Sequence, residues 1–130
     1  MVKIEISIGE LVDKVTILSI KLEKFRDETK KSNVQKEYDI LTVSMNNIGI
    51  TVESEEFKEL RDVNLKLWDI EDNIRRKELN NKFDDEFIEL ARSVYVTNDI
   101  RAKIKKQINL KYNSELIEEK EYVDYEQRGR

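Results

Sequence analysis

The feature that most constrains this chain is the spacing of its apolar residues, which repeats with almost nothing to interrupt it. Two successive runs have intervals of 4, 3, 4 and 3 residues: Leu11, Val15, Leu18, Leu22 and Phe25, then Val34, Tyr38, Leu41, Met45 and Ile48. Such intervals place the side chains on one face of an α-helix. The 130 residues include no proline and only three glycines, so few positions can break a helix. We therefore predict an all-α fold, an antiparallel bundle of long helical hairpins.

Capping residues divide this pattern into separate helices. Ser7 and Glu10 match a capping box and start a helix that we expect to reach about residue 30. Ser32 and Gln35 match a second box, and Gly49 can end the helix that follows because glycine tolerates a positive φ. Further helix starts are expected at Ser54, near Asp84, at residues 97–99 and at Ser114, with helix ends near Leu79 and at Asn113.

The N-terminus has a different pattern. Val2, Ile4, Ile6 and Ile8 alternate with other residues, which favours a short strand before the first helix, with residues 50–52 as its potential partner. The length of the chain fits one domain. We assign residues 1–123 to a single helical domain and residues 124–130 to a polar C-terminal tail that we expect to fray.

Composition excludes several classes of site and partner. The chain has no cysteine and no histidine, so it cannot form a disulfide, a thiolate nucleophile, an imidazole metal site or a Ser-His-Asp triad. Its 24 basic and 28 acidic residues give a net charge of -4, which attracts neither nucleic acid nor an anionic membrane. Charges interrupt the N-terminal segment and every apolar run. We expect a cytoplasmic protein with no cofactor and with no membrane or nucleic-acid partner.

A row of polar residues lies within the apolar face of the third predicted helix. Asn64, Glu71 and Glu78 follow one another at intervals of seven residues, and Arg75 stands beside Glu71. Polar groups embedded in an apolar face need partners. The row is either structural, with an internal Glu71–Arg75 pair and an asparagine that fixes helix register, or it faces a ligand.

The first predicted helix has apolar residues on two sides. Ile17 and Ile20 point away from its main stripe, and long helices in a small chain leave faces that a monomer covers poorly. We therefore predict that Ile17 and Ile20 form an oligomer face. The leading functional hypothesis is a helical protein-interaction or assembly module that acts as a homo-oligomer, with room for a further protein partner.

An alternative function is suggested by basic residues near the predicted break at residues 97–99. Arg92, Asn98 and Arg101 bracket that break, where free amides of a helix start and two guanidinium groups could hold a phosphate or carboxylate. The alternative hypothesis is a small enzyme or sensor that binds an anionic metabolite or nucleotide.

Paired carboxylates offer a variant of this alternative. Glu56 and Glu59, with Glu86 and Glu89, are similar to the paired acids of helical nucleoside-triphosphate pyrophosphohydrolases, although the last acid of that motif is aspartate. Such pairs could hold Mg²⁺ with a nucleotide phosphate. In a chain with 28 acidic residues, pairs at this spacing also arise by chance.

Four phrases taken together resemble a known family. They are IGELVDKVTILSIK, LWDIEDNIRRKE, FDDEFIELARSVYVTNDIRAKIK and NSELIEEKEY, and they extend the resemblance from about Ile4 to about Tyr125. The family is an uncharacterised one of small bacterial and phage proteins, with glycine at the position of Asn113. The resemblance implies a single intact domain and implies no activity, cofactor or catalytic residue.

Overall fold

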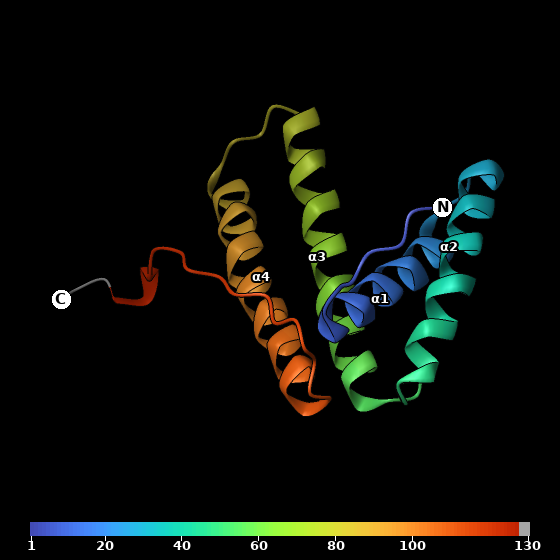
Figure 1. Ribbon diagram of the computed structural model, residues 1–130. Helices are drawn as coiled ribbons and strands as arrows, with labels where there is room; N and C mark the ends of the chain where they lie inside the picture. Colours follow the sequence, from blue (N-terminus) through green and yellow to red (C-terminus); the bar gives the residue numbers. More distant parts are fainter. Residues whose placement is uncertain (128–130) are drawn as a thin grey trace.

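The computed structural model describes residues 1–127, in which four long helices are joined by short links and followed by an irregular C-terminal segment that runs back along the last of them (Figure 1). The helices are α1 (Ile8–Lys24), α2 (Glu28–Asn47), α3 (Glu55–Leu79) and α4 (Asp85–Lys111), followed by the short 3₁₀ helix η1 (Tyr125–Gln127). Helices α1 and α2 form one antiparallel hairpin, and α3 and α4 form another (Figure 1). The predicted all-α class is confirmed.

Helices α2, α3 and α4 are each stopped by a residue with positive φ, two positions beyond the last helical residue. These residues are Gly49 (φ 90°), Asn81 (φ 52°) and Asn113 (φ 55°). Each is followed by a backbone amide that reaches back to the last turn, as Ser114 does to the carbonyl of Asn109 at 2.8 Å. The helix ends predicted at Gly49 and Asn113 are therefore confirmed.

The boundary between the first two helices differs from the prediction. Helix α1 ends at Lys24, and the side chain of Asp27 caps α2 by accepting a hydrogen bond from the amide of Lys30 at 3.0 Å. Phe25 adopts an extended backbone in the link, where its ring lies 6.2 Å from that of Trp68. The second capping box was wrongly predicted, since Ser32 and Gln35 lie inside α2.

Helix α4 is continuous through the predicted break at residues 97–99. Thr97 is buried there, and the carboxylate of Asp99 accepts a hydrogen bond from Tyr125 instead of capping a new helix. The short last helix is also absent from the described residues. Ser114 donates to the carbonyl of Leu116 and accepts from the amide of Ile8, so its hydroxyl caps α1. Tertiary contacts override the local preference of these polar residues for caps.

The N-terminal strand does not form within residues 1–127. Val2 and Ile4 are exposed in an extended segment without a pairing partner strand. Ile50, which was to pair with this segment, is fully buried in the core with Met45 and Phe57. A lone two-stranded ribbon has little stability. Burial of Ile50 in the core therefore stabilises the chain more than strand pairing would. At the other end of the chain, residues 128–130 of the predicted tail lie outside the described part.

Helix α1 is the centre of the molecule, because it packs against α2 on one side and against α3 and α4 on the other (Figure 1). Its buried residues therefore lie all round it: Gly9, Val12, Asp13, Val15, Thr16, Leu18 and Ile20. The prediction of a free face is wrong for Ile20, which is 1% exposed, while Ile17 is half-buried. The chain's own α3 and α4 cover the side that we assigned to a second copy.

Candidate functional site

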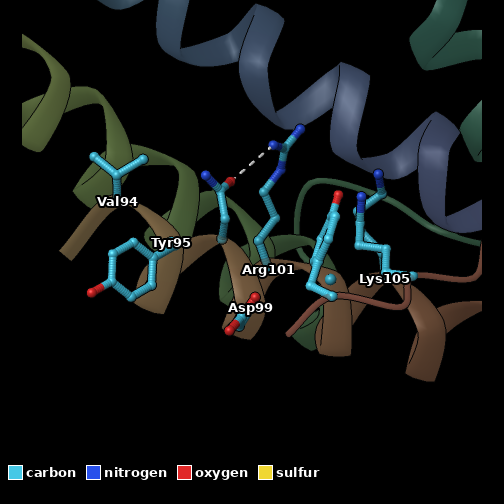
Figure 2. A pocket seen from close by; sticks show the side chains of 9 residues that line it. Val94, Tyr95, Asp99, Arg101 and Lys105 are labelled. Atoms are coloured by element: carbon cyan, nitrogen blue, oxygen red, sulfur yellow. Dashed lines mark hydrogen bonds between the residues drawn. The ribbon is translucent and has the colours of Figure 1, made fainter. Parts of the chain in front are cut away.

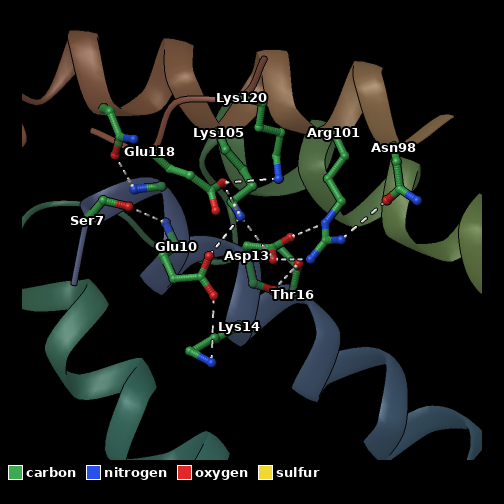
Figure 3. Close-up of polar contacts among 12 residues, drawn as sticks. Ser7, Glu10, Asp13, Lys14, Thr16, Asn98, Arg101, Lys105, Glu118 and Lys120 are labelled. Carbon is green, nitrogen blue, oxygen red and sulfur yellow. Dashed lines mark hydrogen bonds and ion pairs between the residues drawn. The ribbon is translucent and has the colours of Figure 1, made fainter. Parts of the chain in front are cut away.

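A buried carboxylate organises the contact between α1, α3 and α4 (Figure 3). The side chain of Asp13 is 1% exposed and accepts hydrogen bonds from Arg101 Nε at 2.9 Å and Nη2 at 2.5 Å, and from Asn64 Nδ2 at 2.9 Å. Asn64 also donates to the hydroxyl of Thr16 at 2.8 Å. A buried carboxylate needs this set of partners, because its water has been removed. In return, the hydrogen bond to Asp13 raises the pKa of Arg101.

Lys105 extends this network to the C-terminal segment. Its ammonium group donates to Glu10 at 2.7 Å and Glu118 at 3.3 Å, and it lies 3.8 Å from Asp13. Burial lowers the pKa of Lys105, but the hydrogen bond to Glu10 and the nearby carboxylates outweigh burial, and the pKa is raised. The network thus places three carboxylates around two cations, and it joins α1, α4 and residues 114–118.

A pocket of about 490 Å³, which we call the central pocket, lies between α1, α3 and α4. Residues that the sequence singled out for three separate reasons line it together: Ile17, Ile20, Asn64, Glu71, Arg75, Asn98 and Arg101. Leu67, Trp68 and Asp72 complete the lining. A concave site with an apolar wall and a few polar groups is the usual form of a small-molecule site.

The polar row of α3 is embedded only at its first member. Asn64 is buried against Asp13, whereas the side chains of Glu71 and Arg75 are 40% and 71% exposed at the mouth of the central pocket. The Glu71–Arg75 pair forms, but as a surface pair. Glu78 is exposed and lies outside the pocket. The prediction that all four residues lie in an apolar face is wrong.

The proposed anion site is divided by the structure. Asn98 and Arg101 line the central pocket, where Arg101 Nη1 donates a hydrogen bond to Asn98 Oδ1 at 3.4 Å, but Arg92 pairs with Glu89 at 3.2 Å. Because α4 is continuous, no helix start supplies free amides at this point. Anion binding by these residues stays a prediction without that support.

A second pocket, of about 470 Å³, lies on α4 and is also lined by Asn98 and Arg101 (Figure 2). Tyr95 and Tyr122 contribute aromatic rings to it. Figure 2 shows Arg101 and Lys105 rising from α4 toward α1, where their charged ends meet the carboxylates described above. Both cations therefore already pair with carboxylates of the chain itself.

The two pairs of glutamates lie at opposite ends of the α3–α4 hairpin. Glu56 and Glu59 stand in the first turns of α3, beside the end of α4, whereas Glu86 and Glu89 stand in the first turns of α4 (Figure 1). Glu56 accepts hydrogen bonds from Lys111 and from Tyr112 Oη, the latter at 2.7 Å. No group of three or more potential metal ligands occurs among residues 1–127. The acids do not converge as a shared Mg²⁺ site would require.

The contacts of Glu56 make stability depend on pH. Hydrogen bonds from Lys111 and Tyr112 lower its pKa from 4.5 to about 2. The stabilisation that ionised Glu56 gives the folded state is fully present above pH 4.5 and is lost as the pH falls toward 2. Over that interval the unfolded state binds a proton more readily than the folded state, so protonation favours unfolding. We expect Glu56→Gln to cost about 1–2 kcal/mol at pH 7, allowing for screening by solvent, and to flatten the dependence of unfolding free energy on pH over this interval. Urea unfolding from pH 2 to 7 measures this, with the exposed Glu59→Gln as control; equal slopes in both variants would contradict it.

Asp13, Thr16 and Lys105 are not among the site residues predicted from the sequence. A signal for the first two was present, since residues 13, 16, 17 and 20 have the spacing of one helix face. That face mixes Asp13 and Thr16 with Ile17 and Ile20. Polar groups among apolar ones at this spacing indicate a face that is buried with its partners supplied.

These features define an all-α protein with a buried ionic network beside a central pocket. The chain belongs to the family of unknown function DUF6165, whose model matches residues 2–126. No curated protein matches the chain, and neither does a solved structure. None of the helices within residues 1–127 is both long and apolar enough to cross a membrane.

Proposed function

We propose that this protein is an interaction module that associates with a second copy of itself. The observation that carries the proposal is the distal part of the α3–α4 hairpin, residues 76–93, which we call the distal arm. None of its residues is buried. Large apolar side chains on it face solvent instead: Leu79 is 79% exposed, Phe83 56% and Ile88 51%.

The distal arm lacks a second layer in the monomer. Figure 1 shows the ends of α3 and α4 that meet at their loop extending beyond α1, where no other helix of residues 1–127 lies beside them. Two helices alone cover only part of their apolar faces, and stable domains place another layer against them. A second hairpin of the same kind would supply that layer.

A second copy fits the helical form and the symmetry of this surface. Two hairpins packed together form a four-helix bundle, and a two-fold axis places the same residues on both sides of the interface. The proposal therefore moves the expected oligomer face from Ile17 and Ile20 to the distal arm.

Charge reversal on the arm tests the proposal. We expect the wild type to have a dimeric mass by light scattering at about 50 µM, well above a Kd of 1 µM, and Phe83→Glu with Ile88→Lys to have a monomeric mass with unchanged helical circular dichroism. The control, Ile40→Glu with Val43→Lys, makes the same charge changes on exposed residues of α2. It should remain dimeric. A monomeric wild type, or dissociation of the control as well, would overturn the proposal.

Binding of an anionic metabolite or nucleotide remains the alternative, and it is less well supported. Arg101 already pairs with Asp13, and Arg75 pairs with Glu71. Both guanidinium groups of the central pocket are thus neutralised by the protein's own carboxylates. An anion would have to compete with those partners.

A further inference from the structure

The central pocket offers one aromatic ring next to an apolar wall. Trp68 and Leu67 line it from α3, and Ile17 lines it from α1. The indole of Trp68 is half-buried, with its ring centroid 6.2 Å from that of Phe25. A partly buried indole with an apolar surround provides a flat surface on which an apolar face of a ligand can stack.

The polar part of the lining supplies both donors and acceptors. The amide oxygen of Asn98 accepts from Arg101 Nη1 at 3.4 Å, so its amide nitrogen keeps two hydrogens that bond to no group within residues 1–127. Asp72 is exposed on the opposite wall and supplies acceptors. A ligand that matches this lining needs groups that both donate and accept.

The polar groups that α4 contributes, Asn98 and Arg101, are held in place before any ligand arrives. Arg101 is fixed by two hydrogen bonds to the buried Asp13. Its planar guanidinium in turn orients Asn98 (Figure 3). Groups that are already ordered cost little further entropy on binding.

The charges of the pocket are nearly balanced, which disfavours a strongly charged ligand. Glu71 neutralises Arg75, and Asp13 neutralises Arg101. Asp72 is the remaining charge of the lining. The volume of about 490 Å³ falls in the range of about 300–1,000 Å³ that is usual for small-molecule sites.

We propose that the central pocket binds an uncharged carbohydrate, a mono- or disaccharide. Hydroxyl groups carry no charge and both donate and accept hydrogen bonds. They therefore suit a lining of amide, guanidinium and carboxylate groups whose charges nearly balance. The C–H face of a sugar ring would stack on Trp68, while its hydroxyls bond to Asn98 and Asp72. This proposal stands apart from self-association, since one copy forms the whole pocket.

Fluorescence tests the proposal directly, because Trp68 is the chain's single tryptophan. The probes are D-glucose, D-galactose, D-mannose, L-rhamnose, N-acetyl-D-glucosamine, lactose and cellobiose, at up to about 50 mM, well above a Kd of 1 mM. At least one should change the emission of Trp68 saturably and raise the Tm. An absence of both effects for every sugar would overturn the proposal.

Matched variants locate the binding. Asn98→Ala and Asp72→Ala should each weaken sugar binding by about five- to tenfold, the usual effect of one lost hydrogen bond. Asp69→Ala, an exposed acid on α3 that does not line the pocket, should leave the affinity unchanged. Since Asp72 is exposed, its replacement keeps the fold intact even if Asn98→Ala lowers stability. Equal affinity in all three variants would overturn the proposal.

Two further arms separate the competing explanations. Inorganic phosphate and AMP should change neither the emission of Trp68 nor the Tm; a response to them without a response to sugars would replace the carbohydrate by an anionic ligand. The monomeric variant Phe83→Glu with Ile88→Lys should bind the sugar with wild-type affinity. Failure of self-association therefore leaves this result unaffected.

Discussion

Replacing Asp13 by alanine is expected to lower the free energy of unfolding by about 3–5 kcal/mol, because it leaves the partly buried Arg101 without its counter-charge. Arg101 loses two hydrogen bonds, and Lys105 loses a carboxylate 3.8 Å away. The amide of Asn64 loses an acceptor as well. Urea unfolding monitored by circular dichroism measures the loss, with the exposed Asp62→Ala as control. A loss below about 1 kcal/mol would mean that Asp13 is not an essential partner of the network.

A double-mutant cycle shows whether the cost comes from the unpaired cation. In Asp13→Ala with Arg101→Ala, neither member of the pair is left alone, so the double variant should be more stable than the sum of the two single losses predicts. The size of this difference is the coupling between the two side chains. Strict additivity would indicate that the effect of Asp13→Ala comes from lost packing of α1.

Gly9→Ala is expected to cost about 2 kcal/mol or more, because α1 and α4 approach each other too closely there for a methyl group. A Cβ atom on Gly9 would lie 2.4 Å from the carbonyl oxygen of Lys105 and 3.0 Å from Asn109 Oδ1. The neighbour is backbone, so α1 must move, and the 2.6 Å hydrogen bond from the Gly9 amide to Asn109 would be stretched. These effects exceed the gain of about 1 kcal/mol that alanine brings to a helix.

Gly49→Ala provides the matched control, since its cost has a different origin. No atom lies within 4 Å of a Cβ on Gly49, but its φ of 90° strains any residue with a side chain. We expect a loss of about 1 kcal/mol without a change in helix packing. Thermal unfolding of both variants tests the comparison. If Gly9→Ala were as stable as the wild type, the close approach of α1 to α4 would be contradicted.

Local chemistry determined the helix ends that the sequence predicted correctly. Gly49 and Asn113 tolerate a positive φ, and Asp84 caps α4 by accepting from the amide of Phe87. Each of these effects acts within a few residues along the chain. Where the same kind of residue met a distant partner, the prediction failed: Thr97 is buried against other elements, and Asp99 bonds to Tyr125 instead of capping.

Several residues of the candidate site were also predicted from local patterns, but their distant partners were not. Periodicity identified Ile17, Ile20 and Asn64 as unusual for their positions, and charge drew attention to Arg75 and Arg101, but each for a separate reason. One helix wheel cannot show which element will cover a face. Ile20 was therefore assigned to a second copy, whereas the structure covers it within the chain.

By itself, the sequence determined the all-α class, the extent of α3 and the left-handed residues that end helices, because these depend on side chains a few positions apart. Only the tertiary structure decided that α1 lies between α2 and the α3–α4 hairpin (Figure 1). That placement buries Asp13 beside Arg101, which is 88 positions further along the chain. It also brings the separate residues into one pocket and leaves the distal arm uncovered. Contacts at such separation depend on the angles at which whole helices pack, and no local pattern encodes those angles.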